Sequence, residues 1–458
     1  MASRGDIDYD TVQPSLYSRW KIIDFQKSLD ETPKYIKHKT KGLSKSGTYP
    51  VIDQGDSFIG GYINDANKIY TGKLPVIVFG DHTRVVKFID FEFAVGADGT
   101  KILRPNSQLN PKFFYYYLKT LKVPDLGYSR HFKMLKEIKV PLAPRDEQDR
   151  IVVKLDSLFE QLESINKSLY NVPTLLKNFR KQVLTQAVTG KLTEEWREDK
   201  DFPDFKIMGI KNSNFKLHSV PKQWLQTSID QIGKVKGGKR LPKGHALLNE
   251  DTGLPYIRAR DLKEGTVLTD NLMYLLPETQ KSISRYVVQT GDLYITIVGA
   301  KIGDAGIIPE KMDGANLTEN AAKICELKPE VFSQFVSIWL QSNICFNNMM
   351  DSIKSAAQGK LALTRIKLLP IYLPPFKEQQ EIVKCLESLF AKADAIEEHY
   401  KALKTKIEHL PQAILHKAFK GELLQQRESD GNARELLKEI EGLKKGIISK
   451  VKSGNKKK

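Results

Sequence analysis

The sequence predicts an α+β protein in which two globular α/β units alternate with two long helices. Three observations support this prediction. A helical segment occurs twice at a constant offset. Both copies have the heptad spacing of helices that pack along their length, and the region before each copy contains β-branched runs that are typical of strands.

The internal repeat is clearest where residues 140–159 return as residues 371–390. The offset is 231 residues, and it holds without a gap for about 50 residues. Matches persist as far as Leu192 and Leu423. Two unrelated segments would not keep register over this distance, so we interpret the two segments as copies of one structural element.

Apolar residues in each copy recur at alternating spacings of four and three, the a and d pattern of a coiled-coil seam. Two seams of equal length most simply pair with each other, and each spans roughly 50 Å at 1.5 Å per residue. The spacing leaves open whether the helices run parallel or antiparallel. The predicted seam residues are Ile151, Leu155, Leu158, Leu162 and Ile165 in the first copy, and Ile382, Leu386, Leu389, Ile396 and Leu403 in the second.

A proline interrupts each copy, Pro173 in the first and Pro411 in the second. An interior proline costs about 3 kcal/mol and kinks or breaks a helix, but the heptad phase continues past both. We therefore expect a kink or a short break and not the loss of a helix. Gly190 and Gly421 follow the last apolar turn and predict the ends of the two helices.

The two helical copies divide the chain into five segments, counting the copies themselves. Residues 1–145 and 201–376 are predicted to form globular units. Residues 146–200 are the first helical region with its linker, and residues 377–427 are the second helical region. Residues 428–458 form an amphipathic tail that is rich in lysine.

The two globular units contain similar elements in the same order. Residues 75–80 and 293–299 are β-branched strand candidates that end in glycine. Residues 113–118 and 332–340 are aromatic helix candidates. Because their aromatic side chains stand next to apolar residues, we expect them in the protein core and not stacked on bases.

The composition indicates a polyanionic partner. Lysine and arginine number 72 against 55 acidic residues, which gives a net charge of +17, and such an excess favours nucleic acid first and an anionic membrane surface second. No apolar run approaches the ~20 residues of a transmembrane helix, and the first residues lack the pattern of a signal peptide. The cysteines Cys325, Cys345 and Cys385 are too scattered for a disulfide framework or a metal knuckle. We expect a cytoplasmic protein without a membrane partner.

No catalytic constellation emerges from the sequence. The Gly-Lys pairs lack the spacing of a phosphate-binding loop, and His409 and His416 are expected to be solvated and not bound to metal. Residues 373–376 are similar to the Asn/Asp-Pro-Pro-Tyr/Phe tetrad of adenine N6-methyltransferases, but Leu373 cannot accept a hydrogen bond from an adenine amino group. We therefore predict a protein that is not an enzyme and that itself binds no metal or cofactor.

The second copy contains Pro-Pro-x-x-Glu-Gln-x-x-Ile ending at Ile382, Leu-x-x-Leu-Phe at residues 386–390, and Ala-x-x-Gly-x-Leu at residues 418–423. Together these motifs resemble the conserved region of the specificity subunits of type I restriction-modification systems. Residues 190–197 in the first copy are similar to the same family, whereas the second copy departs from it after Leu423. The resemblance covers nearly the whole chain, and its doubling at one offset makes it specific.

The resemblance implies a fold and a role. It implies two target-recognition domains separated by two antiparallel coiled-coil helices with pseudo-two-fold symmetry. Each domain would read one half of a bipartite, asymmetric DNA site, while the coiled coil sets the spacer. Two modification subunits would dock on the chain, bring S-adenosylmethionine and flip an adenine for N6-methylation. Restriction subunits would add ATP- and Mg²⁺-dependent translocation and cleavage, so this chain supplies the address in a host-defence system and not the chemistry.

Candidate DNA contacts are basic and amide side chains beside glycines and strand ends. Arginine and lysine hold phosphates and read guanine, and glutamine reads adenine. Arg258 and Arg260 alternate and are expected to share one strand face. We expect about half of the following set to contact DNA. The candidates are Lys37, Lys39, His82, Arg84, Arg130 and Lys133 in the first unit, and Lys236, Lys239, Arg240, Arg258, Arg260, Lys301, Gln358 and Lys360 in the second.

Two other functions remain open from the residues alone. The chain could be a coiled-coil scaffold, or the DNA-binding subunit of another restriction-methylation assembly. A fused restriction-methylation enzyme would need methyltransferase or nuclease motifs that the sequence lacks. A pure scaffold predicts no sequence-selective DNA binding, and the net charge of +17 argues against it.

Overall fold

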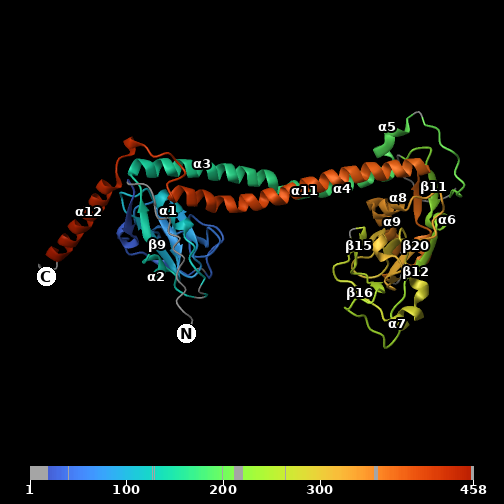
Figure 1. Cartoon of the computed structure of the whole chain (residues 1–458). Coiled ribbons are helices and arrows are strands. Elements are labelled where there is room, and N and C mark those ends of the chain that lie inside the picture. Colours follow the sequence, from blue (N-terminus) through green and yellow to red (C-terminus); the bar gives the residue numbers. More distant parts are fainter. Residues whose placement is uncertain are drawn as a thin grey trace. The chain divides into compact units, whose positions relative to one another are not determined.

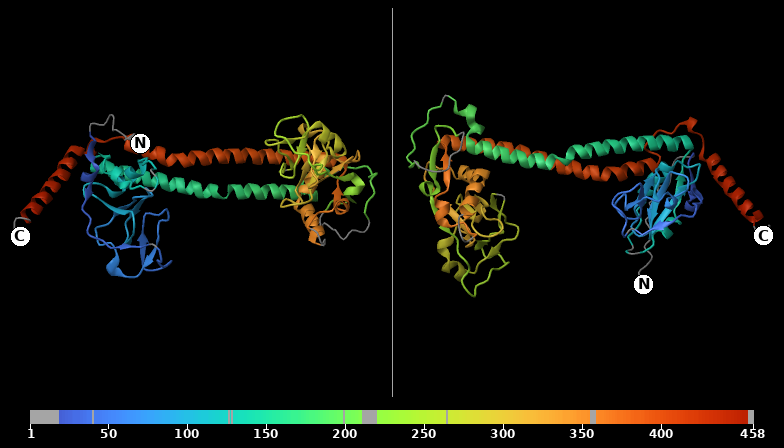
Figure 2. Two further views of the ribbon diagram at one scale, coloured as in Figure 1. Left: turned by 90° about the horizontal axis from the view of Figure 1, so that it is seen from below. Right: turned by 180° about the vertical axis from the view of Figure 1, so that it is seen from behind.

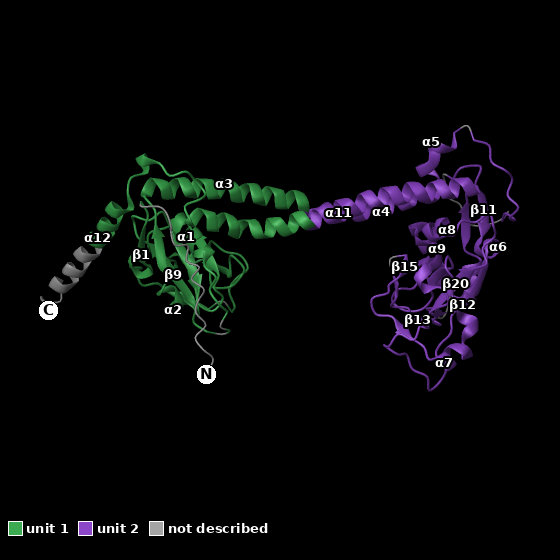
Figure 3. Ribbon diagram, viewed as in Figure 1, with its two compact units in different colours: residues 1–169, 402–458 green, residues 170–401 purple. Residues whose placement is uncertain are grey.

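The computed structural model describes residues 19–39, 41–125, 127, 129–198, 200–210, 220–263, 265–354 and 359–454. The chain divides into two compact units (Figure 3). Unit 1 comprises Met1–Leu169 and Ala402–Lys458, and unit 2 comprises Tyr170–Lys401. Both units contain helices and strands, as the predicted α+β class requires, and helix α11 (Phe376–Phe419) begins in unit 2 and ends in unit 1.

Unit 1 contains two small sheets of four strands each. The first has the order β2-β9-β6-β7 and is antiparallel throughout, and the second has the order β3-β8-β4-β5 with β8 parallel to both β3 and β4. Strands β1 and β10 form a separate antiparallel pair. The strands are β1 (Lys21–Asp24), β2 (Leu29–Asp30), β3 (Lys37–His38), β4 (Tyr49–Ile52), β5 (Gly61–Ile63), β6 (Val76–Gly80), β7 (Val86–Ile89), β8 (Ala94–Gly96), β9 (Thr100–Pro105) and β10 (Lys139–Leu142), and the helices are α1 (Pro111–Thr120), α2 (Phe132–Leu135), α3 (Arg145–Tyr170) and α12 (Ala433–Gly454).

The aromatic helix α1 joins the globular part of unit 1 to its long helices. The side chain of Asn110 caps the helix and Pro111 occupies its first turn, which starts the helix at this point. Phe113 and Tyr117 are buried, and their rings lie 4.9 and 5.5 Å from the ring of Phe419 at the end of α11. The prediction that these aromatic residues lie in the core is confirmed.

Unit 2 repeats this topology. Its antiparallel sheet β12-β20-β17-β18 corresponds strand for strand to β2-β9-β6-β7, and β13 lies parallel to β19 as β4 does to β8. Strands β11 and β21 pair as β1 and β10 do. The strands are β11 (Leu225–Ser228), β12 (Lys234–Gly237), β13 (Pro255–Ile257), β14 (Leu262–Lys263), β15 (Thr266–Val267), β16 (Met273–Tyr274), β17 (Leu293–Thr296), β18 (Ala305–Ile307), β19 (Asn316–Leu317), β20 (Ala321–Cys325) and β21 (Pro370–Leu373), and the helices besides α11 are α4 (Val172–Thr189), α5 (Glu194–Arg197), α6 (Ile229–Ile232), α7 (Pro277–Ser282), α8 (Ser333–Gln341), α9 (Asn343–Lys354) and α10 (Leu363–Lys367).

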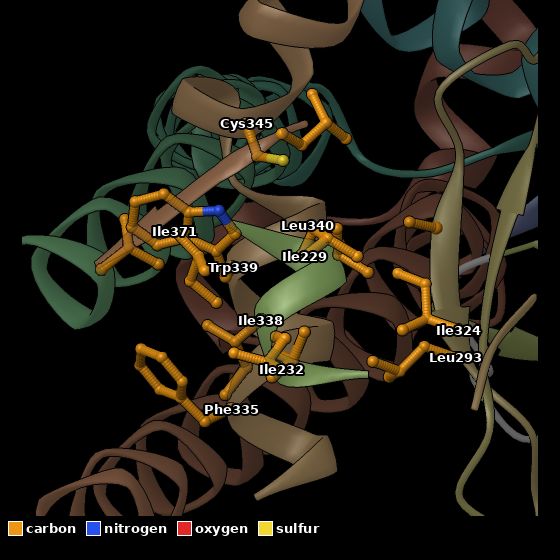
Figure 4. Packing of buried hydrophobic residues seen from close by; sticks show 14 of the residues in the cluster. Ile229, Ile232, Leu293, Ile324, Phe335, Ile338, Trp339, Leu340, Cys345 and Ile371 are labelled. Carbon is orange, nitrogen blue, oxygen red and sulfur yellow. The ribbon is translucent and has the colours of Figure 1, made fainter. Parts of the chain in front are cut away.

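Helix α8 is the buried aromatic helix of unit 2. Phe335 and Trp339 are fully buried, and the indole N–H of Trp339 donates to the carbonyl of Pro370 at 3.1 Å. Figure 4 shows these side chains converging with Ile229 from α6 and Ile371 from β21. The second aromatic helix is therefore also part of a core, as the sequence predicts.

The long helices continue past both prolines. Helix α3 ends at Tyr170 and α4 begins at Val172, so Pro173 is accompanied by a short break, while α11 runs through Pro411. Gly190 ends α4 with a φ of 77°, in the left-handed region that favours glycine. Within each unit the helices lie side by side, α3 with the end of α11 and α4 with its beginning (Figures 1 and 2).

The predicted seam is buried unevenly. The buried members are Ile151, Leu155, Leu162, Ile382 and Leu386, and Leu158 and Leu389 are partly buried. By contrast, Ile165, Ile396 and Leu403 are 42%, 52% and 43% exposed, so the apolar pattern at these three positions does not lead to burial. Two helices without a third layer bury only a narrow stripe.

The predicted tail begins inside unit 1. Ala433, Leu436 and Ile440 of α12 are buried in the same core as α1, and Ala433 N donates to the carbonyl of Arg19 at 3.1 Å. The first turns of α12 therefore belong to the globular fold because their apolar face finds a partner there. No helix in the described part of the chain is long and apolar enough to span a membrane.

Candidate nucleic-acid interface

The end of strand β6 organises the loops of unit 1 that contain the predicted DNA contacts. Asp81 follows β6, and its backbone N–H donates to the carbonyl of Gly99 at 2.8 Å. The carbonyl of Asp81 accepts from His131 N at 2.8 Å, and His38 O accepts from Ala97 N. These bonds bring together segments that are distant in sequence. We name these segments the unit 1 loop cluster, which comprises residues 37–39, 53–58, 81–85, 97–101 and 129–133.

Unit 2 has the same pair of backbone hydrogen bonds at the end of strand β17. Ile297 follows β17, its N–H donates to the carbonyl of Asn320 at 2.8 Å, and its carbonyl accepts from Leu361 N at 3.0 Å. The two units therefore hold their loops in matching backbone frames. We name the second set the unit 2 loop cluster, which comprises residues 237–243, 258–261, 297–304, 318–320 and 359–361.

The exit of strand β12 lies against the turn between β19 and β20. Lys239 N donates to the carbonyl of Leu317 at 2.8 Å, and its ammonium group lies 5.7 Å from the centre of the Tyr286 ring. A Cβ atom on Gly238 would lie 2.0 Å from the carbonyl oxygen of Thr318. Only glycine permits this close approach of two backbones.

Two predicted contacts in unit 1 are tied to neighbouring carbonyls. The ammonium group of Lys37 donates to Thr100 O at 3.2 Å, and partial burial beside Lys101 lowers its pKa. The Nδ1 atom of His82 lies 3.1 Å from Ser129 O. Both side chains therefore stabilise the loop cluster in which they lie.

Arg84 stands at the turn of the β6–β7 hairpin with a φ of 64°. Its guanidinium group donates to Val123 O at 3.1 Å and pairs with Asp125 at 2.7 Å. Arg84 is therefore engaged by partners within unit 1, although the side chains of both Arg84 and Asp125 remain accessible to solvent. The other predicted contacts of unit 1 are exposed, and they are Lys39, Arg130 and Lys133.

Lys236 in β12 and Arg240 after it form ion pairs with acidic side chains that flank strand β20. Lys236 pairs with Glu326 at 2.5 Å, and Arg240 pairs with Glu319 at 2.8 Å. The lysine neighbours lower the pKa of Glu326 to about 2. All four side chains are near the surface, where water screens the charges and such pairs add little to stability. Both cations can therefore exchange their partner for a phosphate at low cost.

The prediction that Arg258 and Arg260 share a strand face is wrong. Strand β13 ends at Ile257, and Asp261 accepts from the backbone N–H of Arg258 at 2.9 Å. This local bond competes with continued strand pairing. The guanidinium group of Arg258 also donates to both carboxylate oxygens of the buried Asp261, at 2.9 and 2.8 Å. This pairing raises the pKa of Arg258. Arg260 stands apart from this pair and is exposed.

The remaining candidates of unit 2 lie around the β17–β18 hairpin. Lys301 is exposed in the hairpin, and Lys360 is exposed just before the segment that bonds to Ile297. Gln358 lies outside the described residues. No three His, Cys, Asp or Glu side chains are grouped as metal ligands in the parts of the chain that the structure describes.

The sequence does not single out two further residues of unit 1, Gln54 in the loop cluster and Lys87 beneath it. The ammonium group of Lys87 is almost fully buried and donates to the carbonyls of Asp53 at 2.9 Å and Ser57 at 2.6 Å. Burial lowers its pKa. In the sequence Lys87 resembles an ordinary solvent-facing strand residue, and no pattern indicates that its ammonium group would bind the carbonyls of a loop.

The repeated Glu-Gln motif joins each long helix to its globular part. Gln148 accepts from Asn110 N at 2.8 Å and donates to Ala143 O at 2.8 Å. Gln379 makes the corresponding bonds to Phe332 N at 2.7 Å and Pro374 O at 2.8 Å. Both glutamines are fully buried. The motif therefore has a structural role in both copies.

The glutamates of this motif have different partners. Fully buried Glu378 accepts from Thr193 at 2.8 Å, from Arg197 Nε at 2.9 Å and from Trp224 Nε1 at 3.0 Å. Glu147 is also buried and accepts from Gln426 at 3.3 Å, but its Oε2 atom has no hydrogen-bond partner in the described part of the chain. Burial raises the pKa of Glu147. Glu378 is bound by Thr193 and Arg197 of the Gly190–Arg197 pattern, and the second copy lacks this pattern, so among the described residues Glu147 has no partners that correspond to these two.

Comparison with known proteins identifies relatives along most of the chain. A family model described as the type I restriction modification DNA specificity domain matches residues 19–172 and 221–408. The chain is 33% identical to the type I restriction enzyme EcoBI specificity subunit of Escherichia coli, over 71% of this chain and 68% of that subunit. It is 30% identical to the EcoKI specificity subunit of Escherichia coli strain K12, over 74% and 71%.

A solved structure has the same fold. The HsdS subunit from Thermoanaerobacter tengcongensis aligns with a TM-score of 0.59 at 17% identity, covering 89% of this chain and 98% of the other. A chain from a structural study of complex assembly and conformational transition in the type I restriction-modification system also aligns with a TM-score of 0.59, at 16% identity and with 89% and 99% coverage.

Proposed function

The chain belongs to the family of type I restriction-modification DNA specificity subunits, and we propose that each of its two units reads one half of a two-part DNA site. The observation that supports this proposal most directly is the pair of matched loop frames. Asp81 and Ile297 make corresponding backbone bonds, yet the side chains around them differ. One scaffold with two sets of side chains suits an asymmetric site whose halves have different sequences.

The exposed cations of both clusters suit contacts with the phosphate backbone, which orient a protein on the duplex before bases are read. Arg84, Arg240 and Arg258 already have carboxylate partners, so they suit loop positioning better than base reading. We propose that phosphates are contacted directly by a set of exposed cations, which are Lys39, Arg130, Lys133, Arg260, Lys301 and Lys360. Lys236 and Arg240 are exposed as well, and they can join this set by leaving their carboxylate partners.

We further propose that α3, α4 and α11 form an antiparallel coiled coil with pseudo-two-fold symmetry, which sets the spacer between the half-sites. The two heptad seams support this arrangement. Contacts of Arg180 on α4 with residues of α11 also support it: the guanidinium group lies 2.6 Å from Asp394, 3.1 Å from Glu397 and 5.4 Å from the Phe390 ring centre.

The proposed role is recognition without catalysis. Two modification subunits would bring S-adenosylmethionine and flip an adenine into their own active sites, and restriction subunits would use ATP and Mg²⁺. Because this assembly acts on chromosomal and invading DNA, we place it in the cytoplasm, with no membrane partner. The buried glutamines of the Glu-Gln motif support a non-catalytic role, because their polar groups are used in joining helix to domain.

Modification-sensitive genome sequencing of the source cell, with the gene intact and deleted, tests this proposal. We expect N6-methyladenine in one gapped, two-part motif to disappear on deletion, and the motif itself reports both half-sites and the spacer. If the chain co-purifies with a methyltransferase but deletion changes no methylated motif, the chain is a scaffold and the proposal fails.

A further inference from the structure

Gln54 lies in the first loop after strand β4, within the unit 1 loop cluster. We propose that Gln54 reads a purine in the half-site bound by unit 1, with a side-chain amide that the protein holds in one orientation. The inference rests on the proposed function of the chain and identifies a specificity-determining residue for it. Four features of the loop cluster support it.

The first feature is the orientation of the amide. Gln54 Oε1 accepts a hydrogen bond from the backbone N–H of His82 at 3.1 Å. Because a backbone N–H can only donate, the oxygen of the amide and not its nitrogen must face His82. Within the described residues no acceptor is bonded to Gln54 Nε2, so both of its hydrogens are available to a ligand.

The second feature is the space in which the amide lies. Gly99 stands beside it with a φ of 79°, and a Cβ atom there would lie 2.4 Å from Gln54 Oε1 and 2.7 Å from Cδ2 of His82. Any other residue at position 99 would displace the amide. Glycine therefore keeps the Gln54 side chain between the β6–β7 hairpin and the turn that precedes β9.

The third feature is the rigidity of the loop. The hydroxyl of Thr83 donates to the carbonyl of Gln54 at 2.5 Å, and the buried ammonium group of Lys87 holds the carbonyls of Asp53 and Ser57. The backbone on both sides of Gln54 is thus fixed to the sheet. A reading side chain that is already ordered loses less conformational entropy on binding.

The fourth feature is the difference between the two units at this position. Ile52 pairs with Val95, and Ile257 pairs with Leu317, in corresponding parallel registers. Two residues after these isoleucines, unit 1 has Gln54 and unit 2 has Ala259. Domains that read different bases are expected to differ where a base is read, whereas the supporting frame is retained.

The chemistry of the amide selects the base. An amide that donates from Nε2 and accepts at Oε1 matches N7 and the N6 amino group of adenine in the major groove. The second lone pair of Oε1 stays available because His82 uses only one. Lys39 and Arg130 in the same cluster carry exposed positive charges that suit the flanking phosphates. Adenine is therefore the base that Gln54 fits best.

The experiment compares Gln54→Glu with the wild-type chain. Glutamate keeps an oxygen that accepts from His82 N, so the loop retains its support, but it loses the Nε2 donor. Gln108→Glu is the matched control, because it makes the same change of charge in unit 1 at the opposite end of strand β9. Each full chain is expressed with the modification subunit of its own system in a host that lacks adenine methylation, and the methylated motif is sequenced.

We expect Gln54→Glu to lower discrimination at one position of one half-site by about tenfold or more, with the other half-site and the spacer unchanged. Gln54→Ala should relax the same position, and Gln108→Glu should leave the motif intact. An unchanged motif with both Gln54 variants overturns the inference and leaves the proposed function standing. Equal weakening at every position of the motif also overturns it, because that is the result of a damaged fold. If the wild-type chain directs no motif, the proposed function fails as well.

Discussion

Arg197 and Glu378 form an ion pair in which Nε lies 2.9 Å from Oε1, and the carboxylate is fully buried. Trp224 and Thr193 donate to the same carboxylate, so all three partners converge on one buried charge. The pair joins the end of the first helical copy to the start of the second within unit 2. It is the clearest case in which the family pattern at residues 190–197 has a physical role.

Removing the cation of this pair should destabilise unit 2 strongly. Arg197→Met leaves the Glu378 charge buried and without its cation, which lowers the free energy of unfolding by about 3–5 kcal/mol. Urea unfolding of the full chain, followed by tryptophan fluorescence, measures the change. Arg145→Met is the control, because the Arg145–Asp149 pair is exposed and its loss should cost less than about 1 kcal/mol. Equal midpoints for the two variants would contradict the prediction.

Glu147 should make unit 1 less stable as the pH rises. Its folded pKa is raised by burial above the ordinary value of 4.5, so the folded state binds more protons than the unfolded state in the window above pH 4.5. Stability is retained below this window and lost as the pH increases through it. Thermal unfolding of the wild-type chain should show this fall, and Glu147→Gln should remove it. A wild-type profile that matches Glu147→Gln at every pH excludes this role.

Gly238→Ala should impair DNA binding by unit 2 alone. The new Cβ would clash with the carbonyl of Thr318, so the exit of β12 must move away from the β19–β20 turn. The affinity for DNA that contains both half-sites should fall. In a competition series with DNA altered in one half-site at a time, the loss of affinity should be confined to the half-site bound by unit 2. Gly244→Ala is a useful control, because a Cβ atom there would meet no atom within 4 Å, and its φ of 88° strains only the loop tip. Equal losses with the two variants would refute the close-approach argument.

Arg258 and Arg260 should respond differently to truncation, although they are two residues apart. Arg260 is exposed, so Arg260→Ala should weaken binding to all sequences and reduce the slope of log affinity against log salt by about 1. Arg258 is held by Asp261 within its own loop, so Arg258→Ala should lower thermal stability and leave the slope unchanged. Fluorescence anisotropy over a salt series measures both slopes. If Arg258→Ala changes the slope and Arg260→Ala does not, then Arg258 and not Arg260 contacts phosphate, and the prediction is wrong.

The sequence predicts the long helices because their determinants are local. The four–three spacing, the repeat at an offset of 231 and the end glycine Gly190 are all visible in the residues themselves, and the helices begin at Arg145 and Phe376. A proline changes a helix through its own ring and its missing N–H. The short break near Pro173 was therefore predictable as well.

The loops that contain the predicted DNA contacts were predictable as segments, but the roles of their side chains were not. Residues 37–39, 82–84 and 130–133 look basic in sequence, and the fold gathers them around Asp81. Sequence alone does not reveal that Asp261 would form an ion pair with Arg258, or that Lys87 would be buried under a loop. Each of these roles depends on a partner that a turn or a neighbouring strand brings close.

The sequence by itself determined the order of the units, the helical repeat, the basic character and the membership of the chain in a family. Only the tertiary structure decided which of the predicted cations are exposed and how Gln54 is oriented. Helical periodicity and net charge are sums over neighbouring residues, so they can be read along the chain. The partner of a side chain is set by residues tens of positions away, such as His82 for Gln54, and this pairing exists only after the strands have assembled.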